Sequence, residues 1–194
     1  MKSFTVRYLG VLGIVSLATL LMMARFDFPW TGIDDANIFF VYARNFADGH
    51  GFVYNVGGER IEGFSSLLWT LVCTVVFYVS SQPALTLLIL NVMTVSLAAT
   101  VALSYLQSTF FGEQDNRYLR FALSLLFLVF LFTSPAYLVW NTIVLMENAL
   151  WGTLLLLATI LVIKTTAIYA LHFHSYSLFF SLHPLLISYG TQSY

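Results

Sequence analysis

The chain of 194 residues is 59% hydrophobic and only 9% charged, and its formal net charge is −1. Soluble domains carry about 25% charged residues, so this composition excludes an ordinary soluble domain, and the net charge indicates no nucleic-acid partner. The apolar residues form long continuous runs, whereas a membrane barrel has segments of alternating hydrophobicity. The sequence therefore predicts an all-α integral membrane protein, a multi-span helical bundle.

The first apolar run covers residues 8–24, and its 17 residues are close to the shortest helix that spans a bilayer. Lys2 and Arg7 precede it, which places the N-terminus in the cytoplasm by the positive-inside rule. No small-residue cleavage site follows, so we expect an uncleaved anchor rather than a signal peptide. Residues 25–64 then form an extracytoplasmic loop.

This loop of residues 25–64 is the polar part of the chain and holds six of the nine acidic residues. Its pattern predicts an amphipathic helix from Asp34 or Asp35 to about Asp48, lying in the membrane interface with its polar side towards water. Gly49 suits the left-handed end of such a helix. A glycine-rich irregular loop follows.

The remaining apolar runs predict further spans at 84–111, 119–133 and 147–163. Residues 1–164 would thus form the N-terminal part of a membrane domain. The tail, 165–194, differs in composition, and we interpret it as an atypical, truncated or frame-shifted end.

Residues 65–80 leave the topology open, because 16 apolar residues are fewer than a span usually has. If they cross the membrane, Arg117 and Arg120 face outside and Glu147 faces inside. If they only dip into the membrane or lie along it, the arginines are cytoplasmic and Glu147 emerges on the side of Asp34. The positive-inside rule favours the second arrangement.

Asp34 and Asp35 are the sharpest candidates for chemistry. One aspartate is enough to cap the helix, and a second carboxylate beside it is suited to a general base or a metal ligand. Arg44 and Arg60 would either pair with nearby carboxylates or hold a phosphate, for which a guanidinium group is suited. His50, between two glycines, is either an exposed loop residue or a catalytic one.

Glu147 stands in apolar surroundings, where a carboxylate is either solvated at the interface or faces a cavity or a partner. Cys73, the single cysteine, lies in an apolar run and is interpreted as a buried structural thiol. No nucleotide-binding or zinc-binding motif is present in the sequence.

The segment IDDANIFFVYARNFADGHGFVYNVGGERIEGFSSLLWTLV resembles the first extracytoplasmic loop of bacterial GT-C glycosyltransferases, in particular members similar to arabinofuranosyltransferases and polyprenyl-phosphate-mannose-dependent enzymes. The acidic pair, ARN, GHG, Asn55 and ER-x-EG occur in the family's order. A second segment, SPAYLVWNTIVLMENALW, resembles another part of the family and places Glu147 on its glutamate.

The resemblance implies transfer of a sugar from a polyprenyl phosphate to an extracytoplasmic glycan, lipid or protein acceptor. One aspartate of the pair would take the acceptor proton. Asp34 is favoured because it shares the polar side of the helix with Arg44, and Asp35 would assist. Mg²⁺ or Mn²⁺ would bind at this pair if the enzyme is one of the metal-dependent members. The other residues implied to bind the donor phosphate or substrate are Arg44, His50, Asn55, Glu59, Arg60, Glu62 and Glu147.

The implied location is the bacterial cytoplasmic membrane, with a cytoplasmic N-terminus. The chain matches only the N-terminal part of the family. The alternative interpretation is therefore a catalytically inactive, truncated paralogue or a membrane partner subunit.

Overall fold

The computed structural model describes residues 2–26, 34–61, 63–111 and 116–190, and the side chains of 4–25, 35–61, 63–111 and 116–169. This part of the chain contains helices and no strand, which confirms the all-α prediction. The chain divides into two compact units, Met1–Leu154 and Leu155–Tyr194. Two predicted site features, the side chain of Asp34 and all of Glu62, lie outside the described residues.

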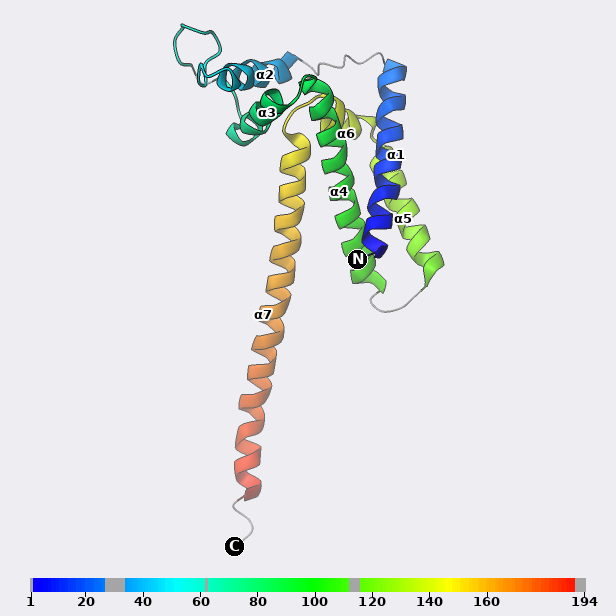
Figure 1. Cartoon of the computed structure of the whole chain (residues 1–194). Helices are drawn as coiled ribbons and strands as arrows, with labels where there is room; N and C mark the ends of the chain where they lie inside the picture. The colour runs from blue at the N-terminus through cyan, green and yellow to red at the C-terminus, as the bar shows by residue number, and fades with distance from the viewer. Residues whose placement is uncertain (1, 27–33, 62, 112–115, 191–194) are drawn as a thin grey trace. The chain divides into compact units, whose positions relative to one another are not determined.

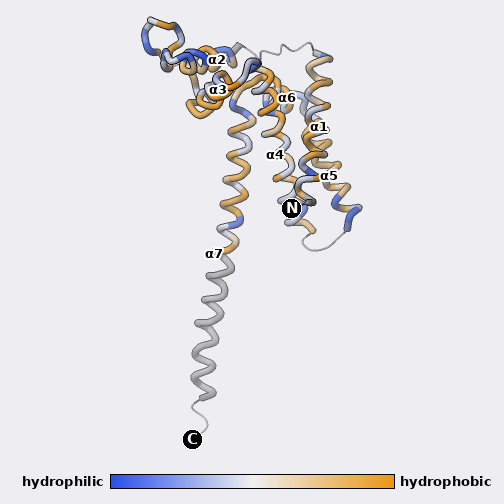
Figure 2. The backbone as a smooth tube through the Cα atoms, in the orientation of Figure 1, coloured by the Kyte–Doolittle hydropathy of each residue, from blue (hydrophilic) through white to orange (hydrophobic). Residues whose placement is uncertain are grey.

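Helices α1 (Lys2–Phe26) and α4 (Pro83–Phe111) pack against each other in opposite directions in the first unit (Figure 1). The residues that α1 buries recur every four positions: Val11, Val15, Thr19 and Met23. Small buried residues on α4, among them Ser96, Ala99 and Thr100, permit close approach of the two backbones. Figure 2 shows hydrophobic residues along both helices.

Among the described residues, three helical segments are long and apolar enough to cross a membrane: Phe4–Arg25, Pro83–Phe111 and Asn148–Tyr169. The spans predicted at 8–24 and 84–111 fall within the first two, and most of the span predicted at 147–163 falls within the third. Long apolar helices are the expected solution in hydrocarbon, where each backbone amide must be bonded within its own segment.

A bent pair of helices occupies the region of the span predicted at 119–133. Helix α5 (Arg117–Phe132) reaches span length only together with α6 (Pro135–Leu138) and the π-helix η1 (Val139–Ile143), and the two parts meet at 82°. Pro135 begins α6, since proline has no backbone N–H to continue the preceding helix.

Thr142 of η1 ties the bent pair to α1 and α4. Its carbonyl oxygen accepts a hydrogen bond from Asn91 Nδ2 at 3.4 Å, and its hydroxyl lies 3.5 Å from the Thr19 hydroxyl. All three side chains are at least 98% buried. This buried polar contact fixes the break in the helix against two of its neighbours.

Helices α2 (Asp34–Ala47) and α3 (Leu67–Val79) form a second layer and pack on each other. Figure 1 shows them beside each other, where α1 ends and α4 begins. The apolar side of α2 is therefore buried by protein, with the following residues at the contact: Ala36, Phe39, Phe40 and Ala43 of α2, and Trp69, Cys73 and Val76 of α3.

Helix α7 (Asn148–Gly190) begins in the first unit and supplies the helical part of the second. It continues past Lys164, so the change in composition at residue 165 does not end the helix. The second unit begins at Leu155, earlier than the boundary predicted from the sequence.

Candidate functional site

The end of α2 carries and fixes the loop that follows it. Gly49 adopts a φ of +85°, the left-handed conformation predicted for the helix end. The amide nitrogen of His50 donates to the Asn45 carbonyl at 2.9 Å. The Asn45 side-chain amide then donates to the carbonyl oxygens of Val53 and Tyr54, at 2.7 and 3.0 Å. One side chain thus folds the glycine-rich loop back onto its helix.

Aromatic side chains form the inner wall of this loop. Phe46 stacks on Phe52 with ring centroids 4.1 Å apart, and Phe52 reaches Phe64 at 5.7 Å. Tyr42 meets Phe64 edge-on at 5.0 Å. A Cβ at Gly63 would lie 2.9 Å from the Tyr42 hydroxyl oxygen, so a larger residue at this position would displace the Tyr42 ring. The side of the loop next to α2 is therefore packed, while residues 54–61 are exposed.

Asn55 and Glu59 border a cavity of about 340 Å³ at this loop. The other lining residues are Ile38, Tyr42, Tyr54, Ile61 and Gly63. Glu59 and Arg60 are exposed, and the Asn55 carbonyl accepts a backbone hydrogen bond from Gly58 at 3.1 Å. A cavity of this size with amide, phenol and carboxylate groups suits a small hydroxyl-bearing ligand.

Glu147 lies beside the other end of the loop. Its Oε1 accepts a hydrogen bond from the Ser65 hydroxyl at 3.2 Å, while its Oε2 is buried with no hydrogen-bond partner among the described residues. Next to it, the indole of Trp151 donates to the Ser66 hydroxyl at 3.4 Å. Two segments 82 residues apart are thereby joined, and one carboxylate oxygen is left able to accept a bond.

The backbone before Glu147 is strained. Leu145 adopts a φ of +59° although it is not glycine, and its side chain is 99% buried. A left-handed conformation is costly for a residue with a bulky side chain and persists only where packing holds it. The strain lets the chain turn sharply between η1 and α7, which brings Glu147 to Ser65.

Asp35 and Arg44 lie on opposite sides of α2. Nine residues separate them, which corresponds to about two and a half turns and about 14 Å of helix. Both side chains are exposed. Arg44 instead lies over the ring of Phe77 in α3, 5.4 Å from its centroid. The structure therefore does not bring this arginine to the described aspartate.

The described side chains do not form a metal site. No group of three carboxylate, imidazole or thiolate side chains among them lies close enough to hold an ion. Because the side chain of Asp34 lies outside the described residues, a divalent cation at the Asp34–Asp35 pair stays a prediction, and no step is assigned to it. Cys73 is fully buried, and burial, followed by the charge of Glu147, raises the pKa of its thiol to about 12.

Several residues of this region were not identified from the sequence: Asn45 as the loop clamp, Ser65 as the partner of Glu147, and Phe77 as the partner of Arg44. The alternation of Phe, Tyr and Gly between residues 46 and 64 is the signal that could have indicated the packed loop. The contacts of Ser65 and Phe77 depend on how α3 lies, which its composition does not specify.

Comparison with known proteins found no family model that matches the chain and no significant match among curated proteins or solved structures.

Proposed function

We propose that the chain is a membrane glycosyltransferase that moves a sugar from a polyprenyl-phosphate donor to an extracytoplasmic acceptor. The observation that carries the proposal is the hydrogen bond between Ser65 and Glu147. The two segments that resemble GT-C glycosyltransferases are distant in sequence, and this contact joins them. Such convergence is expected if both segments serve one site.

The arrangement of α3 supports the topology that such a site needs. This helix has 13 residues, falls below the length of a span and packs on α2. With α3 lying along the membrane, α2, the loop and Glu147 share the extracytoplasmic side, and the N-terminus is cytoplasmic. In this arrangement α2 lies in the membrane interface, as its sequence predicts.

In the proposed reaction, an acceptor hydroxyl attacks the anomeric carbon as the bond from that carbon to the lipid phosphate breaks. A carboxylate of the Asp34–Asp35 pair takes the hydroxyl proton, and the polyprenyl phosphate leaves with the bonding electrons. The cavity beside Asn55 and Glu59 would hold the acceptor. Arg60 of the exposed loop would offset charge on the leaving phosphate.

The test is sugar transfer by the purified chain in lipid vesicles, with radiolabelled polyprenyl-phosphate mannose and arabinofuranose as donors. Asp35→Asn is expected to lower transfer about a hundredfold or more, because general base catalysis contributes at least that much. Asp48→Asn, an exposed aspartate just past the other end of α2, is the matched control and should leave transfer unchanged.

Equal transfer by wild type and Asp35→Asn would refute the role of Asp35. Absence of transfer by the wild type with both donors would instead favour the non-catalytic partner subunit.

A further inference from the structure

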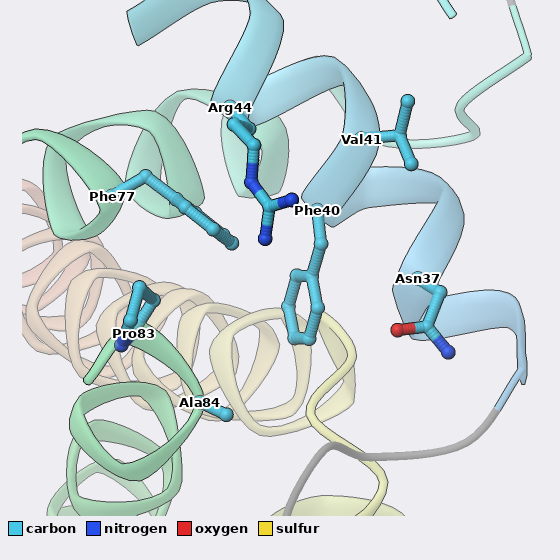
Figure 3. A pocket seen from close by; sticks show the side chains of 7 residues that line it. All are labelled: Asn37, Phe40, Val41, Arg44, Phe77, Pro83 and Ala84. Atoms are coloured by element: carbon cyan, nitrogen blue, oxygen red, sulfur yellow. The ribbon is translucent and has the colours of Figure 1, made fainter. Parts of the chain in front are cut away.

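Arg44 projects into a small pocket between α2, α3 and the start of α4 (Figure 3). The pocket has a volume of about 270 Å³. Its lining is otherwise largely apolar: Phe40, Val41, Phe77, Pro83 and Ala84, with Asn37 at its edge. The side chain of Arg44 is exposed, and no carboxylate of the described residues forms a salt bridge with it. The pocket thus offers one guanidinium group in apolar surroundings.

The outer face of α3 is apolar and lies on another side of the helix from Phe77, the residue of α3 that lines the pocket. Exposed residues recur at helical spacing along it: Leu68, Leu71, Val75, Tyr78 and Val79, of which Tyr78 is 79% exposed. The opposite face, with Trp69 and Cys73, is buried against α2. A helix too short to span, with an apolar face open to its surroundings, is typical of the membrane interface.

We propose that the Arg44 pocket binds the phosphate of an anionic phospholipid of the bilayer in which the outer face of α3 lies. The guanidinium fork matches phosphate oxygens, and Phe77 holds the guanidinium plane in place. The volume admits one headgroup phosphate and is too small for a whole lipid. The lipid would anchor the α2–α3 layer to the membrane.

This site is independent of sugar transfer. Asp35 lies on the other side of α2, about 14 Å along the helix, so a bound phospholipid would occupy neither the carboxylate nor the cavity at Asn55. The phosphate that the site recognises belongs to the bilayer and need carry no sugar.

The test measures lipid binding to the full chain by native mass spectrometry after release from detergent, with phosphatidylglycerol and phosphatidylcholine compared. Arg44→Gln is expected to weaken phosphatidylglycerol binding about tenfold, because the variant loses a charge-assisted hydrogen bond to the phosphate. Arg117→Gln removes an equivalent charge from the exposed start of α5 and should leave binding unchanged. Asp35→Asn should also leave it unchanged, which separates this result from the transfer assay.

A second variant distinguishes a loss of lipid binding from misfolding. Arg44→Lys keeps the charge and loses the fork, and it should bind phosphatidylglycerol with intermediate affinity at wild-type thermal stability. Equal affinity of wild type and Arg44→Gln would overturn the proposal, as would an equal loss in Arg117→Gln. If inorganic phosphate raised the thermal stability of the wild type as much as phosphatidylglycerol does, the assignment to a lipid would be overturned.

Discussion

Glu147 is the residue on which the candidate site depends most, because its two carboxylate oxygens have different surroundings. One accepts the Ser65 hydroxyl, and the other is buried without a partner in the described part of the chain. A buried acceptor without a donor costs free energy, and natural proteins keep such atoms where they meet a ligand or a water molecule. In the proposed function, this oxygen would accept a hydrogen bond from the substrate.

The contact between Ser65 and Glu147 should be measurable as a coupling energy. Ser65→Ala is expected to lower the free energy of unfolding by about 1 kcal/mol in the wild type and by less in a Glu147→Gln background. Thermal unfolding in detergent of the two single variants and the double variant gives the coupling. Ser65→Thr keeps the hydroxyl and serves as the control; equal losses in both backgrounds would show that the bond contributes nothing.

Cys73 should be inert to thiol reagents while the protein is folded. Burial raises its pKa from 9.0 to about 12, so the thiolate that reacts is nearly absent at pH 8. Maleimide should label Tyr78→Cys, which is exposed on the same helix, and leave Cys73 unmodified. Rapid labelling of Cys73 in the wild type would mean that α3 separates from α2.

The same shift has a consequence for stability. The folded state favours the protonated thiol of Cys73. The raised pKa therefore contributes fully to the free energy of unfolding below about pH 9, and this contribution decreases as the pH rises towards 12.

Helix α2 and its loop behave as one element, since Asn45 and the aromatic wall bind the loop to the helix. The sequence predicted the helix and its glycine end well, because capping and glycine conformations are local properties. The sequence did not predict the hydrogen bonds of the Asn45 side chain, because they form only when the loop folds back over α2.

Asn45→Ala should release the loop. The variant loses both bonds from its amide to the Val53 and Tyr54 carbonyls, and two such bonds contribute about 1–3 kcal/mol. Hydrogen exchange of residues 52–61 should therefore be at least about tenfold faster than in the wild type. Asp48→Asn is the control. Unchanged exchange would indicate that the aromatic wall alone holds the loop.

In the first unit, the sequence predicts the long helices but not how the shorter ones lie. The long helices α1 and α4 follow from length and hydropathy, which act along one segment. In the sequence, only Pro135 indicates the 82° bend after α5. The orientation of α3 depends on which neighbour buries Trp69 and Cys73. That choice is a tertiary property, so the position of Glu147 on the side of Asp34 could be stated only as one of two alternatives, and its contact with Ser65 was not predicted.

The topology of the whole molecule is tested by cysteine labelling in membrane vesicles, in a Cys73→Ala background. Asn55→Cys and Asn148→Cys should react with an impermeant maleimide from one side, and Arg117→Cys from the other. The expected sides follow from an arrangement in which α3 lies along the membrane while α1 and α4 cross it. Labelling of positions 55 and 117 from the same side would show that α3 crosses.

The bond between Ser65 and Glu147 closes a loop of 82 residues, and this separation sets an order of assembly. Contacts between α2 and α3 can form once Val79 has left the ribosome, whereas the cluster that buries them is completed later by Leu87 and Leu88 of α4 and by Ile143. The carboxylate arrives after α4, α5 and the bent pair have been synthesised, because a distant contact forms only once the intervening chain is present. During synthesis the α2 surface thus exists first as an incomplete site and gains its glutamate last.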